Sequence, residues 1–246
     1  MSFDALRADA TMPIALDIDV LAGAYPDRPE PARPIHTEGV ATAAVASLRA
    51  ALSDARAGND EVLAMTAPDV LPVAAVDLRD PLGALAELER VVGRGIGAVR
   101  LFPDEQGIEP DFPSMRHVAR HATGLGLVIL SGGDVRRFWR PYAGLGARVV
   151  FLDTHFYHLG DFLLVARDEP GFHTSTRLLN SPDGLELVAE SVGAHRLLFG
   201  SRTPFDEVAV PRLRLARSGL SAEQIALVAG GNARALLAPM TTGEPT

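Results

Sequence analysis

The stretch RLLFGSRTPF, at residues 196–205, joins a short apolar run to a Gly-Ser turn and then to Arg202. An apolar run bounded by turn residues is typical of a buried β-strand, here one that ends beside a guanidinium. Similar runs recur along the chain, and amphipathic stretches that fit α-helices lie between most of them. This alternation predicts an α/β fold built from parallel strands.

Eight strands are expected from these runs. One of them is ambiguous, because residues 39–58 fit either a single amphipathic helix or a strand at 40–48, followed by a loop at 49–58 and a short helix at 59–66. We favour the strand, since it supplies the eighth strand that a closed (β/α)8 barrel needs. The other seven are IALDIDV (14–20), LPVAAVDL (71–78), GAVRLFP (97–103), LVILSGG (127–133), ARVVFLD (147–153), the weaker FHTSTR (172–177) and RLLFGS (196–201).

Helices are expected between the strands, with one exception near the start. The stretch AGAYPDRPEPARPIH carries four prolines, so we expect a Pro-rich loop over 22–37 in place of the first helix of a barrel. Asp134, Ser181 and Ser221 are predicted N-caps, and Ser221 with Gln224 has the pattern of a capping box. The expected helices are 81–93, 113–124, 134–143, 159–168, 182–193 and one or two more over 221–237.

Composition indicates a single globular domain over residues 1–246, with flexible ends at 1–12 and 239–246. The chain is 47% hydrophobic and 22% charged, a balance typical of a packed soluble domain. No apolar run approaches the roughly 20 residues that span a bilayer, which argues against a membrane. The start, MSFDALRADATMP, lacks the basic and apolar regions of a signal peptide, so we expect a cytoplasmic protein.

Charge and missing residue types exclude several classes of function. The formal charge of −8, with no basic run, argues against a nucleic-acid partner. The chain has no cysteine, which excludes disulfides, thiolate metal sites and cysteine nucleophiles. All 23 basic residues are arginine, so a Schiff-base lysine and a Walker A lysine are excluded as well. Because arginine stays protonated, these residues can bind anions but are poor bases.

Five segments stand out along the chain: LDIDVLAG in the first expected strand, GAVRLFP in the fourth, VVFLD followed by HLG in the sixth, RLLFGSRTPF in the eighth and GGNARALL in the last helix. In their order and spacing they resemble the amidohydrolase-2 type family of metal-dependent TIM-barrel hydrolases, within the amidohydrolase superfamily. The resemblance runs from about Ile14 to Leu237 and implies a single (β/α)8 barrel, with its site at the carboxyl ends of the strands.

The metal-binding motifs of that family are degenerate in this chain. The first strand of the family carries Asp-x-His-x-His, and the matching residues here are Asp17, Asp19 and Leu21. A histidine that closes the fifth strand is replaced by Ser131, and the aspartate that ends the eighth strand is replaced by Arg202. Only the histidine of the sixth strand has a match, at His158. We therefore expect no metal and no cofactor.

Four residues are candidates for catalysis. The guanidinium of Arg202 can supply positive charge where the family has a metal, or it can form a structural ion pair with Asp17 or Asp19. The carboxylates of Asp17 and Asp19 point the same way on one strand. They either repel each other and raise the pKa of one of them, which creates a general base near neutral pH, or are neutralised by arginines. His155 and His158 are candidate acids or bases, ligands of a noncanonical metal with Asp19, or ordinary hydrogen-bonding residues. The catalytic candidates are Asp19, His155, His158 and Arg202.

Six further residues are candidates for substrate binding. Arg100 and Arg177, at the ends of two predicted strands, can bind a substrate carboxylate or form ion pairs inside the barrel. The Gly-Gly step after Ser131 can offer backbone amides to an anion, and Trp139 can line a pocket, or both belong to an ordinary turn and a packed helix. The substrate-binding candidates are Asp17, Arg100, Ser131, Asp153, Arg177 and Trp139.

Three functions fit these residues. The first is a metal-independent, amidohydrolase-like enzyme that hydrolyses a lactone, ester or amide, or carries out a lyase reaction such as decarboxylation, on a small anionic substrate. The second is a barrel without catalytic activity that binds a small anion or a protein partner. The third is a mononuclear metallohydrolase whose ligands come from Asp17, Asp19, His155 and His158. A homodimer is compatible with all three.

Overall fold

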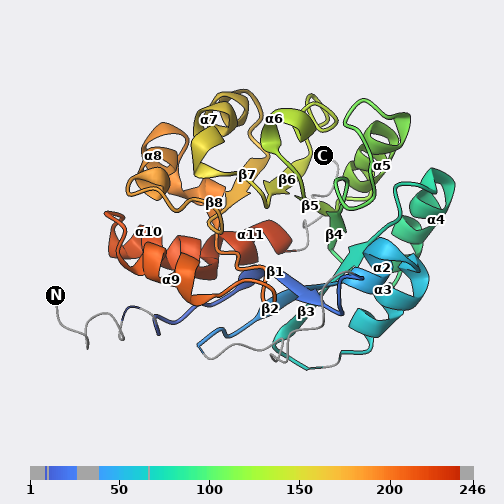
Figure 1. The fold of residues 1–246 in the computed structure, drawn as a ribbon, viewed down its shortest axis with the longest axis horizontal. Helices are drawn as coiled ribbons and strands as arrows, with labels where there is room; N and C mark the ends of the chain where they lie inside the picture. Colours follow the sequence, from blue (N-terminus) through green and yellow to red (C-terminus); the bar gives the residue numbers. More distant parts are fainter. Residues whose placement is uncertain (1–8, 10, 27–38, 66, 239–246) are drawn as a thin grey trace, which may run out of the picture.

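The computed structural model describes residues 9, 11–26, 39–65 and 67–238 and contains one sheet of eight parallel strands. The strands follow one another in chain order around the sheet, as Figure 1 shows. They are β1 (Asp17–Ala22), β2 (Ala43–Ser47), β3 (Val70–Ala75), β4 (Ala98–Leu101), β5 (Val128–Ser131), β6 (Arg148–Phe151), β7 (Phe172–Ser175) and β8 (Leu197–Leu198).

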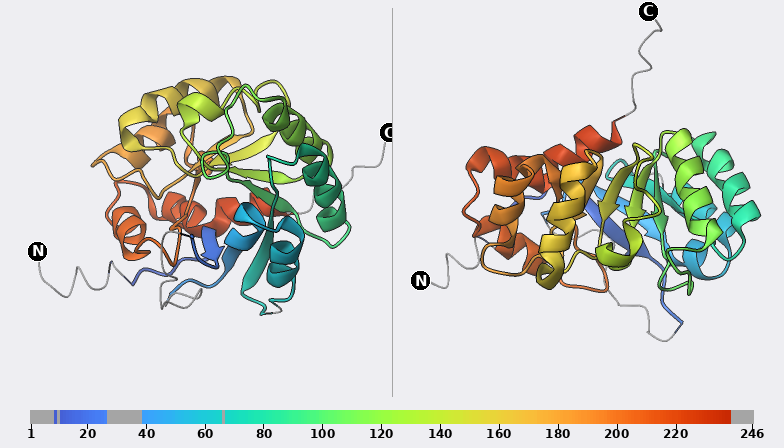
Figure 2. Two further views of the ribbon diagram at one scale, coloured as in Figure 1. Left: turned by 45° about the vertical axis from the view of Figure 1, so that its right-hand side comes forward. Right: turned by 90° about the horizontal axis from the view of Figure 1, so that it is seen from above.

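Backbone hydrogen bonds also join the last strand to the first. The amide of Ile18 donates to the carbonyl of Phe199 at 2.9 Å, and the amide of Leu21 donates to the carbonyl of Thr203 at 2.8 Å. Val20 and Thr203 form a parallel bridge. The sheet is therefore a nearly closed barrel surrounded by helices (Figure 2), and the predicted (β/α)8 fold is confirmed.

The helices alternate with the strands and pack around them. The 3₁₀ helices are η1 (Phe156–His158) and η2 (Ala194–Arg196), η3 (Leu227–Gly231) is a π-helical turn, and α6 (Val135–Phe138) is a single turn of α-helix. None of the helices in the described ranges is long and apolar enough to cross a membrane. The others are α2 (Leu48–Leu52), α3 (Ala55–Leu63), α4 (Pro81–Val92), α5 (Pro113–Gly124), α7 (Leu159–Asp168), α8 (Gly184–Ser191), α9 (Ala209–Ala216), α10 (Ala222–Ala226) and α11 (Asn232–Leu237).

The ambiguous segment after residue 39 contains both a strand and helices. The predicted strand is confirmed as β2, but the predicted loop at 49–58 is wrong, because α2 and α3 fill that region. The side chains of Ser47 and Asp54 accept hydrogen bonds from Ala50 N and Ala57 N and so cap the two helices. Alanine-rich sequence between two such caps favours helix over loop.

Two other expectations about helices are wrong, and one helix was missed. The helix predicted at 134–143 ends at Phe138, since Pro141 cannot continue it, although Asp134 caps it as expected. Ser181 is not an N-cap, because α8 begins after Asp183. Helix α9 was not predicted at all. The capping box of Ser221 with Gln224 is confirmed.

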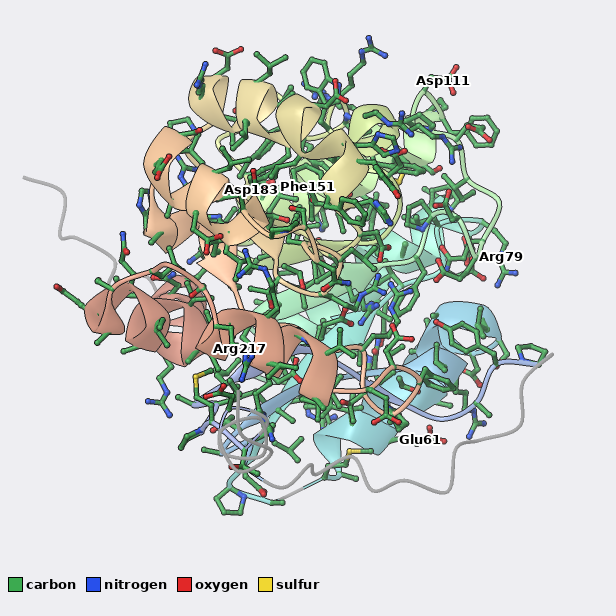
Figure 3. The ribbon with its side chains drawn as sticks, turned by 60° about the vertical axis from the view of Figure 1, so that its left-hand side comes forward. Glu61, Arg79, Asp111, Phe151, Asp183 and Arg217 are labelled. Carbon is green, nitrogen blue, oxygen red and sulfur yellow. The ribbon has the colours of Figure 1, made fainter. Side chains whose placement is uncertain are left out.

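The strands bury both of their faces, which explains their nearly continuous apolar runs. Outward-facing residues pack against the helices. Phe151, labelled in Figure 3, is fully buried there, and its ring meets the rings of Tyr142, Phe162 and Phe172 edge-on. Alternate residues fill the inside of the barrel and form a second cluster, which includes Ala98, Val128, Leu130, Val150, Leu152 and Leu198.

Helix α11 lies across the end of the barrel where the strands begin. Arg148, the first residue of β6, donates from Nη1 to the carbonyl of Leu236 at 2.8 Å, and Leu236 and Leu237 pack on the inner cluster. The opposite end, where the strands finish, is the mouth of the barrel. Most of the predicted loop at 22–37, and most of the predicted flexible ends at 1–12 and 239–246, lie outside the described residues.

Candidate functional site

Three arginines and three aspartates meet where the strands end. Arg100 lies on β4, Arg177 follows β7 by two residues, and Arg202 follows β8. Each comes from a parallel strand, so their side chains converge at the barrel mouth. We call the set the arginine cluster, and its members are Arg100, Arg177, Arg202, Asp19, Asp153 and Asp206.

Asp19 is the carboxylate at the centre of this cluster. Nη1 of Arg100 donates a hydrogen bond to its Oδ1. Its Oδ2 lies 3.5 Å from Nε of Arg177 and 4.0 Å from Nε of Arg202. Complete burial by itself would raise the pKa of Asp19, but the charges of Arg100, Arg202 and Arg177 outweigh it and hold the pKa below its ordinary value. Asp19 is therefore ionised at neutral pH.

Asp153 is a second carboxylate that links two of the arginines. Its Oδ1 accepts hydrogen bonds from Nη2 of Arg177 and, at 2.9 Å, from Nη2 of Arg202. Its Oδ2 accepts a hydrogen bond from the amide of Gly133 at 2.8 Å. The amide that was predicted to bind an anion thus binds the carboxylate of Asp153. Arg177 makes one further ion pair, from Nη1 to Oδ2 of Asp206 at 3.0 Å.

Several buried donors of the cluster have no hydrogen-bond acceptor among the described residues. They are Nε and Nη2 of Arg100, Nε of Arg177 and Nε of Arg202. Arg100 is only 1% exposed, and its guanidinium carbon lies 4.7 Å from the centre of the Phe102 ring. Oδ2 of Asp19, which lies 3.5 Å from Nε of Arg177 and 4.0 Å from Nε of Arg202, likewise makes no hydrogen bond among the described residues. Buried polar groups are normally hydrogen-bonded, so the cluster holds more N–H donors than its carboxylates satisfy.

Aromatic rings lie beside these donors. The ring of Tyr25 meets the ring of Phe205 edge-on at 5.0 Å. Burial raises the pKa of Tyr25, whereas the charges of Arg202 and Arg100 act in the opposite direction, so the phenol is within electrostatic reach of the cluster. With Phe102 under Arg100, the mouth offers cations and aromatic surface together.

Asp17 belongs to a different set of contacts. It is 1% exposed, and its oxygens accept hydrogen bonds from Asp19 N, Ser201 N and the Ser201 hydroxyl. Burial raises its pKa to about 7, against the opposing effect of the Ser201 hydroxyl. Of the two ion pairs predicted for Arg202, the one with Asp19 is present, at 4.0 Å. Asp17 instead binds Ser201, in the turn beside Arg202.

Two predicted substrate-binding residues lie away from the cluster. Ser131 is fully buried on the outward face of β5, where its hydroxyl accepts a hydrogen bond from the Tyr142 hydroxyl at 2.9 Å. Trp139 lies beside Arg140 and lines a groove of about 540 Å³ between α6 and α7. Neither contacts an arginine of the cluster, so the structure lends no support to their predicted role.

The two candidate histidines lie beyond the end of β6. Nδ1 of His155 accepts a hydrogen bond from Tyr157 N at 3.3 Å and caps η1, and its ring stacks on those of Phe156 and Tyr157. His158 lies close enough to Asp134 to contribute to the lowered pKa of that carboxyl, although Arg136 is the main cause. In the part of the chain that the structure describes, no contact joins either histidine to the arginine cluster.

Sequence reasoning missed three residues at the mouth. Asp206 pairs with Arg177, and Ser201 and Thr203 bond to each other on either side of Arg202. The only signal for Ser201 and Thr203 was their position next to a strand-end arginine. Nothing in the sequence pointed to Asp206, since its partner comes from β7, 29 residues away.

The donor set at the mouth does not fit a divalent cation. Among the described residues, no three histidine, aspartate or glutamate side chains come together as a metal site. Asp19 is the central oxygen donor, and three guanidinium groups lie within 4.0 Å of it. A divalent ion placed there would be repelled by these permanent positive charges.

Solved structures share this fold at low sequence identity. 2,6-Dihydroxybenzoate decarboxylase complexed with 2,6-dihydroxybenzoate is 16% identical, with a TM-score of 0.67 over 92% of this chain and 98% of that chain. An uncharacterised TIM-barrel protein from Bordetella bronchiseptica is 18% identical, with a TM-score of 0.69 over 81% of this chain and 78% of that chain. Dihydroxybenzoic acid decarboxylase from Polaromonas, solved with manganese and the inhibitor 2-nitroresorcinol, is 15% identical, with a TM-score of 0.64 over 81% and 82%. No protein-family model matches the chain, and no curated protein matches its sequence.

Proposed function

We propose that this protein is a metal-independent enzyme on an amidohydrolase-like barrel, which binds a small carboxylate substrate at the arginine cluster and removes its carboxyl group. The observation that carries the proposal is a set of buried guanidinium N–H groups on Arg100, Arg177 and Arg202 that make no hydrogen bond among the described residues, although each guanidinium has a carboxylate neighbour. An anionic oxygen of the substrate would supply the acceptors that these donors lack. The aromatic rings of Phe102 and Tyr25 favour a substrate with a flat apolar body.

Each charged residue has a distinct role in this proposal. Arg100 donates Nε and Nη2 to the substrate, while its Nη1 stays bonded to Asp19. Asp153 binds both Arg177 and Arg202, whose Nε atoms lie 3.5 Å and 4.0 Å from Oδ2 of Asp19. The fixed positive charges stabilise the negative charge that builds up on the substrate when the carbon–carbon bond to the carboxyl group breaks.

Decarboxylation is favoured over hydrolysis by the state of Asp19. Hydrolysis needs a base that takes a proton from water, and a carboxylate whose pKa is held below its ordinary value is a weak base. Loss of carbon dioxide needs no activated water: the carbon–carbon bond breaks, its electron pair stays on the substrate carbon, and that carbon then takes a proton from solvent water. Two of the structures with this fold are described as decarboxylases of hydroxylated benzoic acids, which supports the same reaction class.

A barrel that binds an anion without chemistry is the second candidate. It is favoured by the position of His155 and His158, which leaves the cluster without a histidine acid or base among the described residues. Turnover separates the two candidates. Carbon dioxide release from a panel of hydroxylated benzoates supports the enzyme, and binding of the same compounds without release supports the second candidate.

The experiment compares the wild type with Arg202→Ala, in the presence of a chelator. We expect the wild type to bind 2,6-dihydroxybenzoate or benzoate, and Arg202→Ala to weaken binding by about 10- to 100-fold, the effect of losing one or two charge-assisted hydrogen bonds. Arg196→Ala is the matched control, because Arg196 is also buried but donates to backbone carbonyls and His195, away from the mouth.

Two results would overturn the proposal. One is activity or binding that the chelator abolishes and a divalent metal restores. The other is a large fall in the melting temperature of Arg202→Ala with unaltered binding, since that outcome would make Arg202 a structural ion pair. The single domain, the cytoplasmic location, the homodimer and the lack of a nucleic-acid partner stay predictions from the sequence.

A further inference from the structure

The turn after β8 presents Arg202 in an unusual backbone conformation. Its φ angle is +63°, and it is the one residue other than glycine with positive φ in the described ranges. A side chain on Cβ disfavours this left-handed region, so a residue stays there only when its surroundings hold it. The contacts around Arg202 therefore have to supply a restraint.

Asp17 supplies the first part of that restraint. Its Oδ2 accepts a hydrogen bond from the Ser201 hydroxyl at 2.5 Å, and its Oδ1 accepts one from Ser201 N at 3.1 Å. The same Oδ1 accepts a hydrogen bond from Asp19 N at 3.0 Å. One buried carboxylate on β1 thus fixes both the backbone and the side chain of the residue before Arg202.

Ser201 in turn forms hydrogen bonds with Thr203, the residue after Arg202. Its Oγ accepts a hydrogen bond from Thr203 N at 3.0 Å and lies 2.7 Å from Oγ1 of Thr203. The amide of Arg202 itself donates to the carbonyl of Asp19 at 2.6 Å. Residues 201 and 203 are therefore tied to each other and to β1, and the left-handed residue lies between them.

We infer that Asp17 is a positioning residue for Arg202. Through Ser201 and Thr203 it holds the turn that aims the guanidinium of Arg202 at Asp153 and into the cluster. The inference rests on the anion-binding role proposed for Arg202. It also replaces the alternative that Asp17 acts as a base, since both of its oxygens are occupied by Ser201 and the Asp19 amide in a site that is 1% exposed.

Asparagine at position 17 separates positioning from acid–base chemistry. In Asp17→Asn the remaining oxygen can still accept backbone hydrogen bonds, and the new NH₂ group can donate to Ser201 Oγ, whose hydroxyl then turns toward Thr203. The turn is retained while the ionisable group is lost. Asp17→Ala and Ser201→Ala both break the connection.

The measurements are benzoate affinity and the ¹⁵Nε resonance of Arg202, whose Nε–H is buried in the wild type. We expect Asp17→Asn to stay within about threefold of the wild-type affinity, and Ser201→Ala and Asp17→Ala to lose about tenfold, with faster exchange of the Arg202 Nε–H with water. If Asp17→Ala does not fold, Ser201→Ala carries the same test. The control is Tyr142→Phe, which removes a buried hydroxyl bonded to Ser131 and should lower stability without changing affinity or the Arg202 signal.

Either of two outcomes would overturn the inference that Asp17 positions Arg202. It fails if Ser201→Ala keeps wild-type affinity and an unchanged Arg202 resonance, or if Asp17→Asn is as damaging as Asp17→Ala. Failure of the proposed function looks different, because the wild type would then bind no benzoate, while the Arg202 resonance would still report whether Ser201→Ala releases the turn.

Discussion

Replacement of Asp17 by asparagine should change how stability depends on pH. Burial raises the pKa of Asp17 from an ordinary value of 3.8 to about 7, so the folded protein binds this proton more tightly than the unfolded chain does. The resulting stabilisation is fully present below the unfolded pKa and is lost as the pH rises through the folded pKa. Asp17→Asn has no such proton, so its stability lacks this contribution at every pH.

The size of the effect follows from the shift in pKa. A shift of one pKa unit corresponds to about 1.4 kcal/mol, so a rise from 3.8 to about 7 corresponds to about 4 kcal/mol. Between about pH 4 and pH 8 the wild type should lose that much stability relative to Asp17→Asn. Carboxyl groups with lowered pKa values, such as Asp19, oppose this trend, but they are present in both proteins and largely cancel in the difference.

The assay is urea unfolding of both proteins across that pH range, with the difference in unfolding free energy plotted against pH. We expect a difference that changes steeply up to about pH 7 and is level above it. A difference that does not vary with pH would refute the reasoning, because it would mean that Asp17 is already ionised in the folded protein throughout the range.

Two further predictions concern the stability of the fold. Arg100→Met leaves the carboxylate of Asp19 buried without its hydrogen-bonded partner, so urea unfolding should show a free energy of unfolding lower by about 3 to 5 kcal/mol. A decrease below about 1 kcal/mol would show that Arg177 and Arg202 alone are enough to stabilise the charge of Asp19. Gly58→Ala places a Cβ 2.2 Å from Ala50 N, so α2 and α3 must separate, and the free energy of unfolding should fall by about 1 to 3 kcal/mol or more. Gly124→Ala is the control, because the space around Gly124 is open, and it should be neutral or stabilising. Equal effects of the two substitutions would contradict the close contact at Gly58.

The sequence by itself predicted all eight strands, with shifted ends, and two complete helices. Strands of a parallel barrel are buried on both faces, so they leave continuous apolar runs that can be recognised without knowledge of their neighbours. Helices α5 and α7 match the predicted ranges 113–124 and 159–168, because their amphipathic pattern is also local. The segment that forms α2 and α3 was harder, since small alanine side chains fit a strand, a loop or a helix interior.

Five of the six residues of the arginine cluster were predicted from the sequence, all except Asp206, but their pairing was not. Arg100, Arg177 and Arg202 were identified because charged residues that end buried strands of a barrel must lie near its mouth. Only the tertiary structure decided that Arg202 bonds to Asp153, and that the hydroxyl of Ser131 bonds to that of Tyr142 on the outside of the barrel. Pairing depends on distances across the barrel, which are set by the register of all eight strands. A linear pattern records which residues are buried, but it does not record which of them lie opposite one another.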